Sequence, residues 1–315
     1  MAPLRSLGNP DISPFDDVFA ATGKRYNQLY PYVPQGAGAA TRGLFGGSYP
    51  NNNTIDYITV ASAGNATDFG NLTRAVQQAG ALASLTRGLW GGGYESGESD
   101  TIDYVTITST GNATDFGNLV TGQHGVAGLS DTTRGVFCGG TVDATMMQYI
   151  TMASTGNASD FGDSAAASRN NCAGQSHTRG YVAGGNSNQI GYITIQTLGN
   201  TTDFGDLSWT MNYGTGQSNA TRGLITRGQS DYSVDYITID TTGNATDFGD
   251  TTSYGKEISS MCTSDTRAVR GGGSSPNTNV MDYATIDTTG NFTDFGDLNT
   301  TGNSKAATSN GHGGL

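Results

Sequence analysis

The sequence predicts an all-β protein built from six repeats, and three observations support this prediction. Glycine supplies 48 of the 315 residues, about twice its usual share, while charged residues make up only 13%. Thr, Ser and Asn are abundant and Lys and Glu are scarce, which argues against a helical bundle. Three short motifs recur six times in the same order, roughly 45 residues apart. A chain of this length exceeds the usual size of a single core, so growth by added units fits it well.

The three motifs define the repeat. The first is Thr-Arg-Gly, written Thr-Arg-Ala in the last copy; the second is a Tyr followed two residues later by Thr; the third is Gly-Asn-x-(Thr/Ser)-Asp-Phe-Gly. The first motif supplies one arginine to each repeat: Arg42, Arg87, Arg134, Arg179, Arg222 and Arg267. The third motif supplies one aspartate to each repeat: Asp68, Asp115, Asp160, Asp203, Asp247 and Asp294.

Each repeat is predicted to hold four strands, as its second copy illustrates. Residues 77–84 are rich in Ala and Gly, and residues 86–90 form a short strand that a run of glycines ends. Residues 101–107 alternate polar and β-branched apolar side chains, the strongest strand pattern of the repeat. A Gly-Asn turn at residues 110–112 leads to the fourth strand, residues 113–119.

Four short strands in about 45 residues are typical of a propeller blade. Six copies therefore predict a six-bladed β-propeller of four-stranded antiparallel blades, with a short N-terminal arm before it. Small residues in the first strand fit the crowded position next to the axis. The paired glycines after the second strand allow the backbone to turn without a side-chain clash.

The glycine pair, followed by a spaced Tyr and a second aromatic residue, resembles the kelch repeat. In the first unit these are Gly46, Gly47, Tyr57 and Phe69. Phe stands throughout where kelch repeats usually carry Trp, and residues 225–228 of the fifth unit read Ile-Thr-Arg-Gly instead of the glycine pair. The resemblance covers residues 35–315 and implies a kelch-like architecture.

A second resemblance is closer in sequence. The phrases at residues 133–137, 102–107 and 243–250 resemble repeat proteins encoded by marine bacteriophages, particularly cyanophages. This resemblance implies a non-enzymatic structural or appendage protein of the virion, such as a tail, fibre or capsid-decoration component. It would present its loops for assembly or host-surface attachment, in several copies.

Charge and composition limit the partners. Fifteen Lys and Arg against 27 Asp and Glu give a net charge of −12, so a nucleic-acid partner is not expected. No apolar run approaches the roughly 20 residues of a membrane-spanning helix. Residues 1–5 lack the apolar stretch of a signal peptide, so secretion is not expected. Three cysteines, Cys138, Cys172 and Cys262, are too few and too odd in number for a disulfide framework.

Residues 1–34 match none of the three motifs and form the N-terminal arm. Residues 13–21 are predicted to be a short helix, with Ser13 as its cap, Pro14 at its first position and Gly23 after its end. The arm either packs against its own propeller or docks the propeller on another virion protein.

No catalytic, cofactor-binding or metal-binding residue is predicted. His124, His177 and His312 fall at different phases of the repeat, and the spacing of Cys172 from His177 matches no standard zinc pair. The repeated Asp could bind calcium, but capping of backbone amides or pairing with Arg is favoured. The repeated Arg could form an anion-binding ring, but hydrogen bonds between blades are favoured.

Two classes of function remain open. The first is the virion structural or attachment module, whose loops vary at residues 48–53, 94–100 and 274–279. The alternative is a glycan-binding, lectin-like propeller or, less favoured, a propeller enzyme. Trp90 and Trp209 lie at different repeat phases, which argues against the repeated aromatic pairs of a lectin.

Seven segments are candidates for an inner strand, one more than six blades need. The segment within residues 303–311 repeats the small-residue pattern of a first strand, at the place where a seventh unit would begin. We expect it to pair with residues 41–45 of the first unit and close the ring. Residues 36–40 are the competing candidate for this position.

Overall fold

The computed structural model describes residues 41–315 apart from 166–168, 229–230, 253–257 and 275. The chain divides into two units, Met1–Ala40 and Thr41–Leu315. The N-terminal arm of residues 1–34, its predicted helix and the competing segment 36–40 lie outside the described residues.

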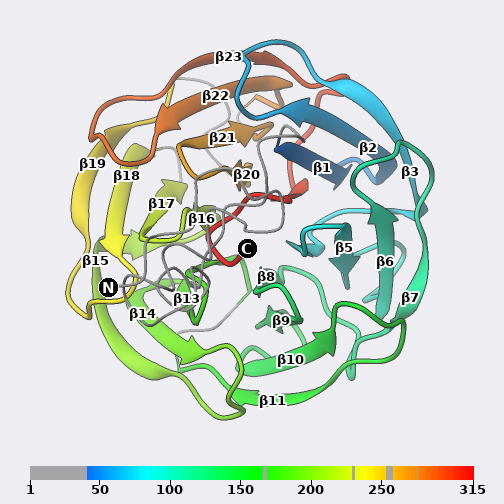
Figure 1. The fold of residues 1–315 in the computed structure, drawn as a ribbon, viewed down its shortest axis with the longest axis horizontal. Helices are drawn as coiled ribbons and strands as arrows, with labels where there is room; N and C mark the ends of the chain where they lie inside the picture. The colour runs from blue at the N-terminus through cyan, green and yellow to red at the C-terminus, as the bar shows by residue number, and fades with distance from the viewer. Residues whose placement is uncertain (1–40, 166–168, 229–230, 253–257, 275) are drawn as a thin grey trace, which may run out of the picture. The chain divides into compact units, whose positions relative to one another are not determined.

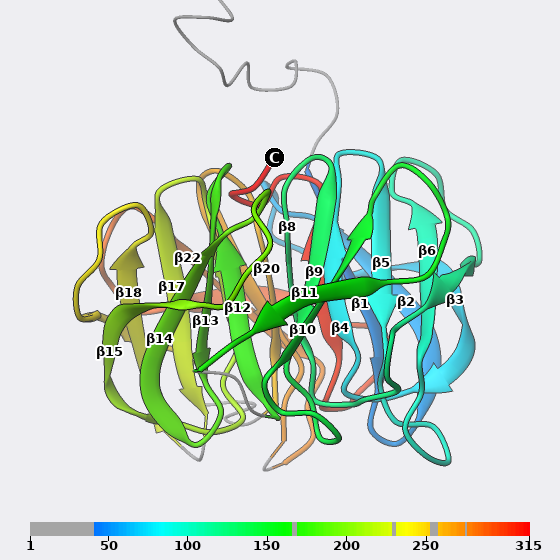
Figure 2. The same ribbon diagram turned by 90° about the horizontal axis from the view of Figure 1, so that it is seen from below.

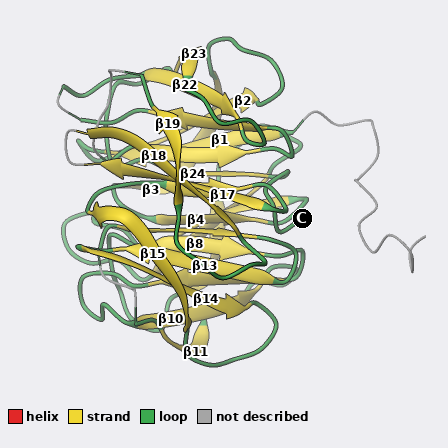
Figure 3. Cartoon of the chain, turned by 90° about the vertical axis from the view of Figure 1, so that its left-hand side faces the viewer, coloured by secondary structure: helices red, strands yellow, loops and turns green. Residues whose placement is uncertain are grey.

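The second unit is a six-bladed β-propeller of four-stranded antiparallel blades, as the sequence predicts (Figure 1). Strands and loops alone make up the described residues, and no helix is found among them (Figure 3). Within this described part of the chain there is likewise no helix long and apolar enough to cross a membrane.

The strands of each blade run outward from the axis in the order first to fourth. In the first three blades they are β24 (Ala306–Ser309), β1 (Arg42–Ser48), β2 (Asn52–Thr59) and β3 (Thr67–Val76); β4 (Gly80–Ala83), β5 (Arg87–Gly91), β6 (Thr101–Thr106) and β7 (Thr114–Asn118); β8 (Ala127–Ser130), β9 (Arg134–Cys138), β10 (Met146–Thr151) and β11 (Ser159–Asp163). In the last three they are β12 (Asn171–Gln175), β13 (Arg179–Gly184), β14 (Ser187–Thr194) and β15 (Thr202–Met211); β16 (Gly216–Ser218), β17 (Arg222–Gly228), β18 (Asp231–Thr238) and β19 (Thr246–Asp250); β20 (Ser260–Thr263), β21 (Arg267–Gly271), β22 (Val280–Thr285) and β23 (Thr293–Asp297).

The core lies between the blades rather than within them. One cluster joins Leu89 and Ile102 of the second blade to Phe137 and Ile150 of the third, and all four side chains are at most 2% exposed. The small side chains of β4 are all buried beside the axis, whereas the outer strand β7 buries only Phe116. Each blade therefore relies on its neighbours to bury its apolar faces.

The C-terminal strand β24 is the inner strand of the first blade. It pairs antiparallel with β1, with Gly43 opposite Ser309 and Gly46 opposite Ala306. The indole Nε1 of Trp90, in the second blade, donates to the carbonyl of Ala306 at 3.1 Å. A Cβ on Gly46 would lie 2.6 Å from that Nε1, so glycine leaves the room that the indole needs.

The antiparallel blades give the ring two faces. One side carries the turns that join the first strand to the second and the third strand to the fourth, and we call it the hairpin face. The opposite side, the loop face, carries the loops from second to third strands and those leading to the next blade. Figure 2 shows the β8–β9 turn and the C-terminus on the same side, the hairpin face.

Candidate functional site

The repeated arginines join each blade to the next one along the chain. Each guanidinium lies over the Tyr of its own third strand, 4.2 to 4.9 Å from the ring centroid. Each also donates to a backbone carbonyl at the end of the next blade's third strand, as Arg179 Nη1 does to Ile239 O at 3.1 Å. The other acceptors are the carbonyls of Ile107, Met152, Ile195, Ile286 and, for Arg267, Ala61. The arginines therefore lie between blades, and these contacts to carbonyls close the ring from the sixth blade to the first.

The tyrosine beneath each arginine meets the Phe of the fourth strand edge-on. The centroids of these pairs are 5.8 to 6.3 Å apart in all six blades. This stack of Arg, Tyr and Phe accounts for three of the repeated residues, because each layer covers the one below it.

The Gly-Asn turn of each blade bonds to the outer strand of the blade before it. Gly111 N donates to Phe69 O at 2.8 Å, and Asn71 N donates to Asn112 Oδ1 at 3.1 Å. The five other turn asparagines accept the equivalent bond: Asn65, Asn157, Asn200, Asn244 and Asn291. This turn is the reason for the glycine of Asp-Phe-Gly, since it packs directly against that residue's Cα.

The repeated aspartates are exposed on the outer strands. Within the described residues, none of the six makes a hydrogen bond to a backbone amide or an ion pair with an arginine. The capping or Arg-pairing role suggested by the sequence is therefore not found. No group of three or more His, Cys, Asp or Glu placed to hold a metal ion occurs in the described part of the chain.

A second set of acids, on the third strands, makes the contacts that the first set lacks. Asp56, Asp103, Asp235 and Asp282 are at most 1% exposed, and each accepts hydrogen bonds from the residue that leaves the preceding blade. Asp235, for example, accepts from Ser208 N at 2.8 Å and from Ser208 Oγ at 3.0 Å. Burial raises the pKa of Asp56, Asp103 and Asp235 above the ordinary value.

Two blades replace this acid and keep the bond. Gln148 Oε1 accepts from Val120 N at 2.5 Å in the third blade. In the fourth blade the position is Gly191, and Thr201 Oγ1 accepts from Ala165 N at 3.0 Å instead. A Cβ on Gly191 would meet the Thr201 side chain at 3.0 Å, so the threonine takes the missing side chain's place. In these four blades an Asp directly precedes the repeated Tyr. A charged residue within an otherwise apolar strand could have indicated this buried set from the sequence.

We expect Asp235→Ala to lower the free energy of unfolding by about 2 kcal/mol, because the Ser208 N–H loses its buried acceptor. Asp247→Ala is the matched control: Asp247 lies opposite Asp235 in the register but is exposed, and its loss should change stability by less than about 0.5 kcal/mol. Urea denaturation of both variants measures the difference. Equal losses would show that the inter-blade bond contributes nothing.

The C-terminal residues fill the axis at the hairpin face. His312 is 1% exposed, and its Nε2 lies 2.9 Å from Ala83 O. Its Nδ1 accepts from Gln175 Nε2 at 2.7 Å and from Gly314 N at 3.1 Å. Because two donors face Nδ1, the proton of the neutral ring is on Nε2. Burial lowers the pKa of His312 to about 4.

His312 binds to the two inner strands that lack a hydroxyl group at their last residue. At the end of four first strands, a hydroxyl donates to the carbonyl of the preceding blade: Ser130, Ser218, Thr263 and Ser309. The same position holds Ala83 and Gln175 in the two remaining blades, and His312 forms hydrogen bonds with both of them. The histidine thus supplies hydrogen bonds to the two inner strands that lack the hydroxyl.

We expect stability to fall as the pH drops from about 6.5 to 4, because the unfolded His312 takes up a proton that the folded ring does not. The loss amounts to about 3 kcal/mol over this range. Asp131 and His177 are the titratable groups that act on the His312 ring electrostatically. Urea denaturation at several pH values should show a shallower fall for His312→Gln than for the parent or for His124→Gln, a change at a histidine on the loop face. The same pH slope in all three proteins would contradict this.

The loop face carries two exposed aromatic side chains at equivalent positions. Tyr49 and Tyr94, each two residues past a glycine pair, are 50% and 37% exposed. Asn51 Nδ2 donates to Glu95 O at 2.6 Å, which ties the two loops together. His124 joins the second loop through Glu98 Oε2 at 2.7 Å. The loops of the first two blades and the segment that leads from the second blade to the third are therefore cross-linked.

The three cysteines are buried inside the ring. Burial raises the pKa of each thiol, to about 12 for Cys138 and Cys172, so all three remain protonated at neutral pH. Cys172 Sγ donates a weak hydrogen bond to Met211 Sδ at 3.8 Å. The cysteines thus pack the core.

No protein-family model matches this chain, and no curated protein matches it either. The resemblance to phage repeat proteins gains no support from these comparisons, whereas the propeller architecture is established by the structure.

Proposed function

We propose that this protein is a non-enzymatic structural or appendage component of a virion, which uses a rigid ring to present a variable loop face. The proposal rests on the contrast between the contacts that join the blades, which are the same in every blade, and the loops of the loop face, which vary. Arg-to-carbonyl bonds and Gly-Asn turns recur in every blade, while the loops on the opposite face differ in length and sequence from blade to blade. Variable loops on a fixed scaffold are where binding usually occurs.

The partners follow from this role. We propose that residues 1–34 bind other virion proteins and that the loop face contacts a glycan or protein of the host surface, with many copies in one particle. The net charge of −12 favours neither nucleic acid nor an anionic membrane as a partner.

Mass spectrometry of purified particles tests the proposed location. The protein should be recovered in a constant ratio to the major virion proteins, and antibodies against it should label intact particles in electron microscopy. Recovery only from the soluble fraction of the host cell would overturn the proposal.

Deletion of residues 1–34 should leave a folded propeller that no longer assembles, because the ring contacts described above lie within residues 41–315. Circular dichroism and thermal melting check the fold, and co-sedimentation with particles checks assembly. Tyr94→Ser, a change on the loop face, is the control and should assemble normally. Normal assembly of the deletion would contradict the docking role of the arm.

A further inference from the structure

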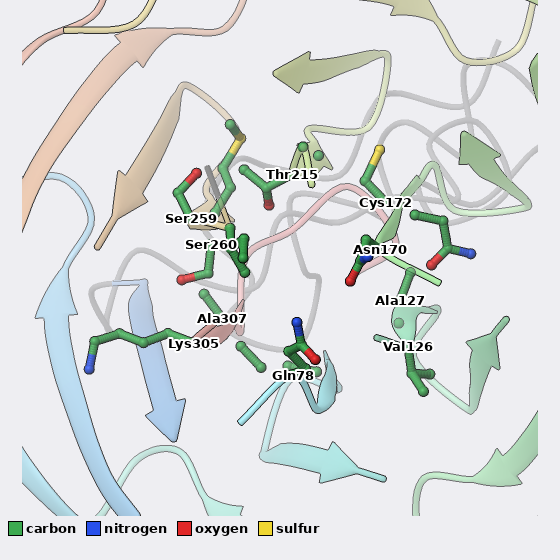
Figure 4. A pocket seen from close by; sticks show the side chains of 18 of the residues that line it. Gln78, Val126, Ala127, Asn170, Cys172, Thr215, Ser259, Ser260, Lys305 and Ala307 are labelled. Carbon is green, nitrogen blue, oxygen red and sulfur yellow. The ribbon is translucent and has the colours of Figure 1, made fainter. Parts of the chain in front are cut away.

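The axial channel holds a cavity at the loop face (Figure 4). Its volume is about 100 Å³, and the beginnings of all six first strands line it. This is room for several water molecules or for a group the size of one sugar ring. At the hairpin face the axis is filled by the residues around His312, so access is from the loop face.

The rim of the cavity is a ring of backbone in an uncommon conformation. A residue one to three positions before each first strand has a φ between 52° and 68°: Gln78, Gly125, Asn170, Tyr213, Ile258 and Ser304. Five of the six N–H groups donate to the carbonyl of the equivalent residue in the preceding blade, at 2.9 to 3.0 Å. Non-glycine residues in this region are strained, and a β-branched one such as Ile258 especially so. The hydrogen-bonded ring holds them there and fixes the shape of the opening.

Three of the side chains that line the cavity are polar and uncharged and reach into it. The amides of Gln78 and Asn170 and the hydroxyl of Thr215 face the enclosed space in Figure 4. Among the described residues, none of these three groups has a hydrogen-bond partner. Lys305 is the charged residue of the lining, but its side chain leads away from the cavity and its Nζ donates to Thr300 Oγ1 at 2.9 Å. The cavity therefore offers free donors and acceptors without a net charge.

We propose that this axial pocket binds one neutral, hydroxyl-rich ring, such as the terminal sugar of a glycan. A charged ligand would lose its hydration without gaining a counter-ion. An apolar ligand would leave the amides of Gln78 and Asn170 unpaired. Hydroxyl groups, which both donate and accept, satisfy amides and Thr215 alike. The inference rests on the proposed attachment role of the loop face and names the class of ligand recognised there.

The cavity supplies its own probes for the test. Six alanine methyl groups line it, so a full-length protein with ¹³C-labelled alanine methyls reports occupancy directly: Ala79, Ala81, Ala127, Ala173, Ala306 and Ala307. Glucose, galactose, mannose and N-acetylglucosamine are added in turn, with glucuronate and glucosamine as charged counterparts. We expect at least one neutral sugar to shift these methyl signals saturably, while Ala245 and Ala284, which are not in the lining, stay unchanged. The charged counterpart should bind about tenfold more weakly or not at all.

Asn170→Gly and Asn186→Gly form a matched pair of variants. Both asparagines have positive φ, 60° and 65°, so glycine keeps the backbone in each case. Only Asn170 lines the cavity. Sugar binding should weaken about tenfold in the first variant and not in the second. Absence of saturable shifts with every neutral sugar, equal binding of the charged ones, or equal effects of both variants would overturn the assignment.

This test is separate from the test of virion location. Sugar binding by a protein that is missing from particles would keep the pocket and reject the virion role. A protein that is found in virions but binds no sugar in its cavity would keep the virion role and reject the proposed ligand.

Discussion

Removal of residues 303–315 is expected to lower the free energy of unfolding by several kcal/mol and to cause aggregation. The truncation deletes β24, which leaves one edge of β1 unpaired and takes the acceptor from the indole of Trp90. It also exposes apolar side chains of the first blade, such as Phe45, which are buried against Ala307. Because the ring then has a gap between its first and last blades, the loss spreads beyond one pair of strands.

Thermal melting and light scattering measure this effect. Removal of residues 310–315 alone is the control, since it deletes the segment around His312 and keeps the strand. The shorter truncation should cost clearly less and should not aggregate. Unchanged thermal stability of the longer truncation would show that another segment, such as residues 36–40, fills the inner position.

Gly249→Ala is expected to destabilise the protein by about 3 kcal/mol. Gly249 belongs to Asp-Phe-Gly of the fifth blade and has a φ of 140°. A Cβ there would lie 2.7 Å from the carbonyl carbon and oxygen of Gly290, the turn glycine of the sixth blade. Backbone cannot swing aside as a side chain can, so the two blades must separate.

Gly290→Ala separates the clash from the backbone conformation. Gly290 also has a positive φ, 156°, but a Cβ there would meet nothing within 4 Å. This variant should cost about 1 kcal/mol, the penalty of the conformation alone. Chemical denaturation compares the two proteins, and equal losses would mean that the contact between blades is unimportant.

The repeat alone determined the architecture, because residues at the same phase occupy the same place in every blade. The alternation at residues 101–107 marks the third strand, and the Gly-Asn turn marks its end. The small residues near the C-terminus likewise indicated an inner strand, and β24 lies there, paired with β1.

The partners across each blade boundary were decided by the tertiary structure. Asp235 and Asp247 look alike in the sequence, yet one is buried against Ser208 and the other is exposed on the outer strand. Alternation along a strand shows that a side chain faces a neighbour, but the twist and spacing of adjacent blades decide which residue that neighbour is.

Which residues meet at the axis of the ring could not be predicted from the sequence either. His312 lies outside the three motifs, and its partners Ala83 and Gln175 are more than 130 residues away. The positive φ of Gln78 and Ile258 follows from hydrogen bonds around the ring rather than from their own preferences. The sequence thus determined the six blades through short-range repetition. Only closure of the ring determined what meets at its centre, because closure brings distant segments of the chain to one axis.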